Sequence, residues 1–271
     1  MNVFVPLFMV VVAVCWFLVY TGRVAPTDPR LLLSVAGALA AGAVFFLYMY
    51  AKAGRARADE MRRVAEGLGW EFAARLPVET LPGADRFQIF TGEAVRREGD
   101  ESARPLRWRT RRVAENVLRG GAGGAEVFVF DLLTQHVERP AGAPGRGSYT
   151  ETVVCASVPG AGLPRFALAP KGFWPRLGTL AGGSDVEVGS RPGLSRLYSL
   201  RGEDEGAVRR LFEAPALASF FEAREGLCAE GEGDRLAFYR HGVSLPPERL
   251  RPFIDESLEA VRLFNAARDR A

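Results

Sequence analysis

The chain has 271 residues, with 35 lysines and arginines against 32 acidic residues, which gives a formal net charge of +3. The positive excess lies within the first 70 residues, so the rest of the chain is neutral. A neutral domain lacks the net basic surface that nucleic-acid binding usually requires, and no nucleic-acid partner is expected. The three cysteines are scattered without C-x-x-C spacing, which is no sign of a disulfide framework, a zinc site or a thioredoxin-like centre.

Two uncharged apolar runs open the chain, at residues 3–21 and 31–51. Each has about 20 residues, which as a helix spans ~30 Å, the thickness of a bilayer's hydrocarbon core. The pair predicts a transmembrane helical hairpin joined by the loop 22–30. A cleaved signal peptide is the alternative for the first run, but Met1 and Asn2 supply no positive n-region.

Basic residues near the membrane ends predict the orientation of this hairpin. The loop carries Arg23 and Arg30, whereas residues 52–63 carry five basic side chains. Both termini are therefore expected in the cytoplasm, which makes the chain a multi-pass protein of the inner membrane with a cytoplasmic C-terminal domain. The second run is rich in alanine and glycine, which favours close packing against the first run or, alternatively, against a second copy in a homo-oligomer.

The remaining residues predict an α+β fold with a mainly antiparallel sheet. Residues 52–68 read as a basic amphipathic helix next to the membrane. Residues 69–271 form the expected cytoplasmic domain, with a possible internal boundary at 171–193. Glycine-rich turns at 120–124 and 233–234 predict two β-hairpins.

Further elements follow from local patterns in the expected domain. The strand at 127–130 is apolar on both faces, which predicts a central position in the sheet. Residues 165–169 and 194–200 are expected as additional strands. The C-terminal third is expected to be helical, with acidic residues opening one helix at 203–205 and a long apolar stripe over 247–269.

Several segments occur in an order that resembles a known family. They are Gly69 and Trp70 before a strand, residues 87–90, 116–118, 129–131 and 152–154, the sequence LPRFALAP at 163–170, and 200–205 running into 208–212. Together they resemble a family of uncharacterised bacterial proteins that carry an N-terminal membrane anchor and a cytoplasmic α+β domain. The resemblance implies this architecture and no assigned activity, so it supplies no functional residue.

Two groups of residues suggest chemistry and also have plain structural explanations. Cys155 and His136 lie on neighbouring expected strands with Asp131 nearby, and a Cys–His pair can act as a nucleophile and its base. A buried strand cysteine explains the same residue without catalysis. The acidic cluster Glu203, Asp204 and Glu205 could bind a cation, but a helix N-terminus also favours acids. The glycines at 120–124 lack the lysine of a phosphate-binding loop.

Basic residues supply the remaining candidate surface. We expect contact with anionic lipid head groups from a set of basic side chains and one tryptophan near the expected anchor: Lys52, Arg55, Arg57, Arg62, Arg63, Arg107, Trp108, Arg109, Arg111 and Arg112. The first functional hypothesis is a membrane-anchored, non-catalytic module without a cofactor or metal, which binds a partner protein or the membrane surface. The alternative is a membrane-bound hydrolase that uses Cys155 and His136 or the acidic cluster.

Overall fold

The computed structural model describes residues 29–91, 110–136, 148–171 and 184–269. The chain divides into two compact units, residues 1–57 and 58–271. Helix α2 (Pro29–Leu68) runs from one unit into the other, so the predicted second span and the predicted basic helix are one continuous helix of 40 residues. The predicted first span, at 3–21, lies outside the described residues.

The predicted membrane hairpin is not supported by α2. Within the described part of the chain, no helix is at once long enough and apolar enough to cross a membrane. This finding contradicts the transmembrane hairpin and, with it, the predicted multi-pass location in the inner membrane. Beyond Ala51 the same helix continues to Leu68 through a strongly charged stretch.

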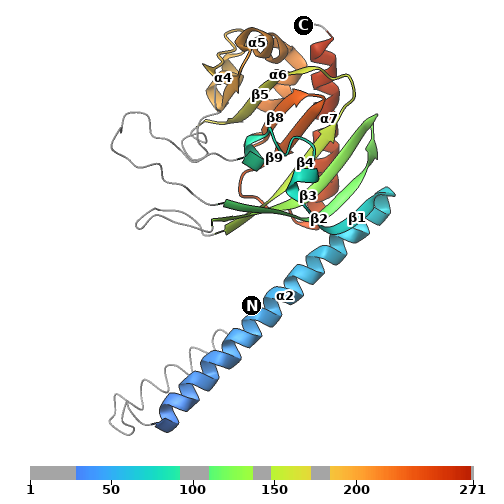
Figure 1. Ribbon diagram of the computed structural model, residues 1–271. Helices are drawn as coiled ribbons and strands as arrows, with labels where there is room; N and C mark the ends of the chain where they lie inside the picture. The colour runs from blue at the N-terminus through green and yellow to red at the C-terminus, as the bar shows by residue number, and fades with distance from the viewer. Residues whose placement is uncertain (1–28, 92–109, 137–147, 172–183, 270–271) are drawn as a thin grey trace, which may run out of the picture. The chain divides into compact units, whose positions relative to one another are not determined.

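The second unit is built on an antiparallel sheet (Figure 1), to which the described residues contribute nine strands. Its strands are β1 (Glu71–Leu76), β2 (Thr110–Ala122), β3 (Ala125–His136), β4 (Ser148–Ser157), β5 (Leu163–Pro170), β6 (Ser184–Asp185), β7 (Tyr198–Gly202), β8 (Cys228–Gly233) and β9 (Arg235–Tyr239). They lie in the order β1-β2-β3-β4-β9-β8-β5-β7-β6. The predicted α+β class, with an antiparallel sheet and a C-terminal helix, is confirmed.

Glycines close the two predicted hairpins. Between β2 and β3, Gly123 and Gly124 have φ of 60° and 81°, and Gly233 between β8 and β9 has φ of 57°. Residues that carry a side chain rarely adopt such backbone angles, which explains why glycine occupies these turns. One predicted strand is wrong at its start, because the residues from Pro192 form helix α4 (Pro192–Leu197) and β7 begins only at Tyr198. Proline is well tolerated in the first turn of a helix, and it starts α4 here.

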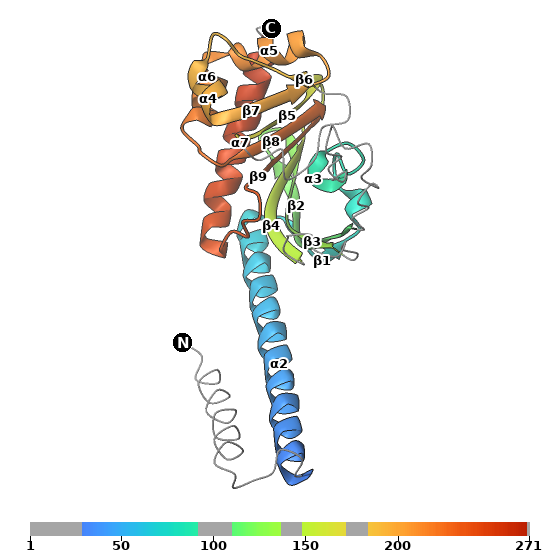
Figure 2. The same cartoon turned by 90° about the vertical axis from the view of Figure 1, so that its left-hand side faces the viewer.

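Three further helices cover one face of the sheet: α5 (Glu205–Glu213), α6 (Pro215–Glu222) and α7 (Pro247–Arg268). Figure 2 shows α7 along this face and α3 on the opposite side of the sheet. The core beneath the helices is aromatic, since the ring of Phe166 lies 5.2 Å from that of Phe212 and 5.1 Å from that of Phe264. Met61 and Ala65, near the end of α2, are fully buried in the same core.

The opposite face of the sheet has a thinner cover. It consists, among the described residues, of the short helix η1 (Val78–Thr80), the loop after it and the single turn α3 (Gln88–Thr91). Phe90 of α3 stacks on Phe130 of β3 with ring centres 6.1 Å apart. Neither η1 nor α3 is predicted from the sequence. We call residues 76–91 the cover segment, because they close this face.

A β-bulge in β2 decides which side chains face the cover segment. The pairing of β2 with β3 shifts between Glu115 and Leu118, and Asn116 at that point has φ of 54°. Side chains alternate across a strand, so Arg112 and Arg119, seven residues apart, would otherwise face opposite sides. The extra residue restores them to one face, and both line the same groove beneath the cover segment.

Candidate functional site

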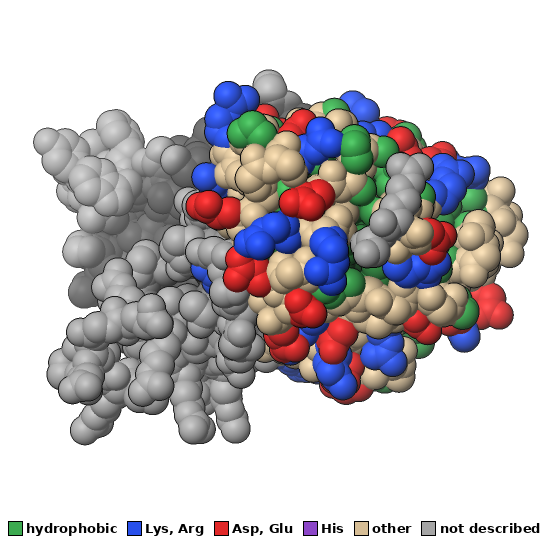
Figure 3. All heavy atoms as spheres, turned by 90° about the horizontal axis from the view of Figure 1, so that it is seen from above, with side chains coloured by type: hydrophobic (Ala, Val, Ile, Leu, Met, Phe, Trp, Pro, Cys, Tyr) green, Lys and Arg blue, Asp and Glu red, His purple; other side chains and the backbone are tan. Residues whose placement is uncertain are grey.

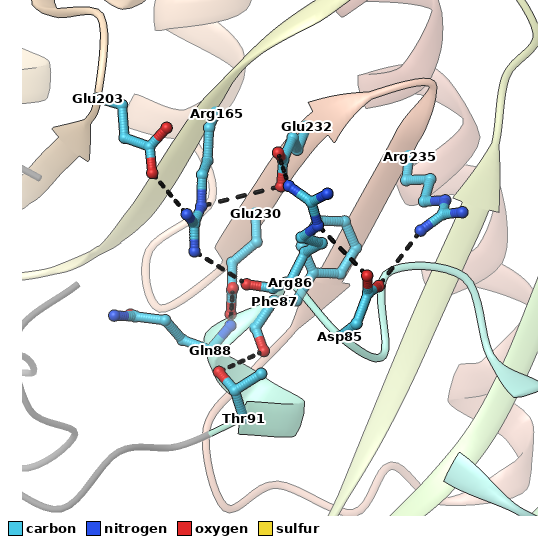
Figure 4. Close-up of polar contacts among 10 residues, drawn as sticks. All are labelled: Asp85, Arg86, Phe87, Gln88, Thr91, Arg165, Glu203, Glu230, Glu232 and Arg235. Carbon is cyan, nitrogen blue, oxygen red and sulfur yellow. Dashed lines mark hydrogen bonds and ion pairs between the residues drawn. The ribbon is translucent and has the colours of Figure 1, made fainter. Parts of the chain in front are cut away.

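A buried carboxylate fixes the cover segment to the sheet. Glu230 of β8 is 2% exposed, and its side chain accepts hydrogen bonds from the backbone N–H groups of Gln88 and Ile89, the latter at 3.1 Å. The Tyr239 hydroxyl donates a third bond to Glu230 Oε1 at 2.8 Å. Figure 4 shows Glu230 reaching from the sheet to the start of α3. These three bonds anchor a turn of helix whose own sequence gives it little stability.

Burial dominates the ionisation of Glu230. Desolvation raises the pKa of this carboxyl to about 7, although the bonds from Tyr239, Gln88 and Ile89 act in the opposite direction. The negative charge of Glu151, which is also buried, raises it further. Burial likewise raises the pKa of Tyr239 well above its ordinary value. Glu230 therefore changes charge near neutral pH while it holds the cover segment.

Ion pairs at the edge of the cover segment add to this anchor (Figure 4). Arg86 Nη1 lies 2.7 Å from Glu232 Oε1, and Asp85 Oδ1 lies 3.4 Å from Arg235 Nη1. Arg165 donates to the Arg86 carbonyl at 3.4 Å and pairs with Glu203 at 2.5 Å. Exposed pairs of this kind contribute roughly 0–1 kcal/mol each, so they align the segment more than they hold it.

A groove of about 870 Å³ lies between the cover segment and the sheet. Its apolar lining comes from both sides: Leu76, Val78, Leu81, Pro82, Ala84, Phe90 and Phe128. Its polar lining consists of Glu79, Thr80, Asp85, Arg112, Arg119, Glu126, Ser157 and Arg235. The volume falls in the range of roughly 300–1,000 Å³ that is usual for ligand sites. A groove with mixed lining can hold an apolar body and orient a polar group.

Beside the groove, a second polar cluster lies on the same face. The Glu151 carboxylate, 2% exposed, lies 3.2 Å from His241 Nδ1 and accepts a bond from the Gly242 N–H at 3.0 Å. The ring of Tyr149 meets that of His241 edge-on at 5.1 Å. Burial raises the pKa of Tyr149, and the Glu151 charge adds to that rise. The cluster holds the turn after β9 against β4.

The structure does not bring Cys155 and His136 together. Cys155 lies opposite Phe128 on β3, whereas His136 is at the far end of that strand opposite Thr110. Eight residues of strand separate Phe128 from His136, about 27 Å at the usual rise. Burial raises the pKa of the Cys155 and Cys228 thiols, which disfavours the reactive thiolate.

Each residue of the predicted acidic cluster has a protein partner. Glu203 pairs with Arg165, the Asp204 side chain accepts from the Ala207 N–H at 2.9 Å as the N-cap of α5, and Glu205 pairs with Arg209. These contacts account for the three acids as the start of a helix.

The predicted lipid-contact residues separate in the structure. Those on α2 are charged side chains of its second half, where Arg62 pairs with Asp59 at 2.9 Å and lies 4.9 Å from the Phe72 ring. Arg107, Trp108 and Arg109 lie outside the described residues. Arg111 is exposed, whereas Arg112 is half-buried in the groove. The sequence analysis missed the groove. Because side chains alternate across a strand, Arg111 and Arg112 had to face opposite sides of β2, and this alternation was the available signal.

The surface seen in Figure 3 intersperses acidic and basic side chains over its described part. Such an arrangement produces no strong field of one sign on that face, so it does not select a highly charged partner.

Comparisons with known proteins give one structural likeness. No protein-family model matches the chain, and no curated protein matches it. The fold is similar to the crystal structure of the mycobacterial trehalose monomycolate transport factor A, TtfA, with a TM-score of 0.48 and 16% sequence identity. The likeness covers 79% of this chain and 94% of that chain.

Proposed function

We propose that this chain is a non-catalytic binding module whose binding site is the groove beneath the cover segment. One observation carries the proposal: the wall of the groove is fixed to the sheet by the buried Glu230, so the groove of about 870 Å³ exists before any ligand arrives. A preformed hollow loses less conformational entropy on binding than one that must be assembled.

The chemistry of the groove residues favours binding over catalysis. Its basic groups are guanidinium groups, which stay protonated and do not act as general bases. Two of its acids are engaged in ion pairs, Glu126 with Arg119 and Asp85 with Arg235. The thiols of Cys155 and Cys228 are buried in the core beneath.

Photo-crosslinking in cells tests this proposal. The photoreactive amino acid p-benzoylphenylalanine replaces Glu79, which is exposed and lines the groove, in the full chain. Irradiation is expected to give one discrete adduct, whose mass identifies the occupant. The same amino acid in place of Glu213, exposed on α5 at the other face, is the control.

Filling the groove should remove the adduct. Ala84→Trp places a large ring on the wall of the groove, and the adduct at position 79 should disappear while thermal unfolding stays cooperative. If position 79 gives no adduct in the folded protein, or the same adducts as position 213, the groove is not the binding site.

A further inference from the structure

Arg112 forms no ion pair among the described residues, although the Tyr149 and Glu151 side chains act electrostatically on its guanidinium group. Its guanidinium Nε is buried and has no hydrogen-bond partner in the described structure. Burial lowers the pKa of Arg112 from its ordinary value, yet an arginine remains protonated in proteins. A buried donor without an acceptor costs free energy, and a charged one costs more. Such a residue is expected to persist where a ligand supplies the missing acceptor.

The other two arginines of the groove are already neutralised. Arg119 Nη2 lies 2.7 Å from Glu126 Oε1, and its guanidinium lies 5.4 Å from the centre of the Phe128 ring. Arg235 pairs with Asp85 at 3.4 Å. Among the described residues that line the groove, Arg112 is therefore the arginine that forms no ion pair.

Glu151 does not supply the acceptor that the Arg112 guanidinium lacks. Its charge acts on Arg112, but no oxygen of Glu151 comes within ion-pair distance of the guanidinium in the described structure. The carboxylate is instead engaged by His241 and by the Gly242 N–H. Turning Glu151 toward Arg112 would break both contacts, so the two groups stay apart.

Apolar side chains continue from Arg112 along the groove. Val78, Leu81 and Phe90 come from the cover segment, and Phe128 lies on the sheet toward the Arg119 end. Six residues of β3 lie opposite the stretch from Arg112 to Arg119, which therefore measures about 20 Å at the usual rise per residue. A charged group at one end and an apolar trough behind it match a ligand with an anionic head and an alkyl chain.

We propose that Arg112 binds the carboxylate head group of a single-chain amphiphile whose alkyl chain lies along the groove toward Phe128. A carboxylate fits because its two oxygens accept parallel bonds from a guanidinium group. This inference rests on the proposed function, since it names the ligand class of the same groove.

Three probes built on the same ten-carbon chain separate the contribution of the head group to binding from that of the alkyl chain. Titration calorimetry of the full chain is run with decanoate, decanol and decyltrimethylammonium. Decanoate is expected to bind at least about tenfold more tightly than decanol, the scale of one hydrogen bond to a charged group, and decyltrimethylammonium more weakly still. Equal binding of decanoate and decanol would show that no anion is recognised and overturns the proposal.

The substitution Arg112→Met distinguishes a ligand-binding arginine from a merely structural one, because the two cases predict opposite changes in the unfolding temperature. It removes an unpaired, half-buried charge whose Nε is fully buried, so the unliganded protein should unfold at a higher temperature while decanoate binding falls by about tenfold or more. Arg111→Met, an exposed neighbour on the same strand, should leave both unchanged. A lower unfolding temperature in Arg112→Met means that Arg112 stabilises the fold, and the proposal then fails.

The photo-adduct at position 79 keeps the two proposals distinct. Decanoate should suppress that adduct if it occupies the groove. If the adduct forms, has the mass of a protein and resists decanoate, the groove still binds a partner but the ligand class is wrong. If no adduct forms at all, the proposed function itself fails.

Discussion

Asn116 donates its side-chain amide to Asp131 Oδ2 at 3.0 Å, across the bulge in β2. Asn116 is, among the described residues, the one non-glycine with a positive φ. Asparagine tolerates this conformation better than most residues, and here its hydrogen bond to the buried Asp131 stabilises the conformation further. The pair therefore fixes the register that places Arg112 and Arg119 on one face.

Substitution at the bulge should separate conformational strain from hydrogen bonding. Asn116→Val places a β-branched residue at φ of 54° and also loses the bond to Asp131, so the free energy of unfolding should fall by about 2–4 kcal/mol. Asn116→Gly removes the strain and should lose only about 1 kcal/mol. Urea denaturation measures both variants, and equal losses would contradict the role of backbone conformation.

The stability of the domain should depend on pH through Glu230. Its pKa is about 7 in the folded protein against an ordinary value of 4.5, so the folded state binds more protons between these values. Stability is therefore greatest, as far as this group is concerned, below about pH 4.5, and it falls as the pH rises through 7, by about 3 kcal/mol in total. Glu230→Gln should flatten this dependence in urea melts recorded from pH 5 to pH 8. An unchanged slope in the variant would assign the dependence to other groups.

The strand β3 should not tolerate a charge at its buried centre. Phe130 is fully buried and stacks on Phe90, so Phe130→Asp should abolish cooperative unfolding. Phe130→Leu keeps the site apolar and should remain folded. Phe128→Asp should be less damaging, because that side chain lines the groove and lies near Arg119. Circular dichroism during heating compares the three, and a stable Phe130→Asp would show that this position is exposed.

Cys155 should behave as a small apolar group. It is fully buried, so Cys155→Ala should stay folded, whereas Cys155→Ser introduces a hydroxyl in an apolar core and should lose about 1–3 kcal/mol more. In the unmodified protein, Cys155 and Cys228 should react with a thiol reagent only at the rate of unfolding. Rapid labelling of either thiol in the native state would indicate an accessible, reactive cysteine.

The elements that the sequence predicts are those with local signals. The β2–β3 and β8–β9 hairpins follow from glycines that must adopt positive φ, and the interior position of β3 follows from apolar residues on both faces. The strand expected over 194–200 is wrong over 194–197, which belong to α4, because short apolar stretches carry no clear period.

The candidate site depends on partners that are distant in sequence. The single turn α3 is held by Glu230, 142 residues from Gln88, and nothing in the local sequence at 88–91 indicates a helix. The bulge at Asn116 reverses the alternation of β2, so a period-2 pattern assigns Arg112 and Arg119 to opposite faces. These long-range contacts create the groove, and no local pattern encodes them.

The strand order has a consequence for synthesis of the chain. The hairpin β8–β9 is made late, after most of the sheet, yet it lies between β4 and β5 near the middle of the strand order. A nascent chain that ends before Cys228 holds two strands, β4 and β5, whose inner edges have not yet met their partners. Unpaired edges of this kind pair readily with other chains. Nearly the whole protein must therefore leave the ribosome before β8 and β9 can join β4 to β5. Chains that end at a premature stop should aggregate rather than form stable fragments.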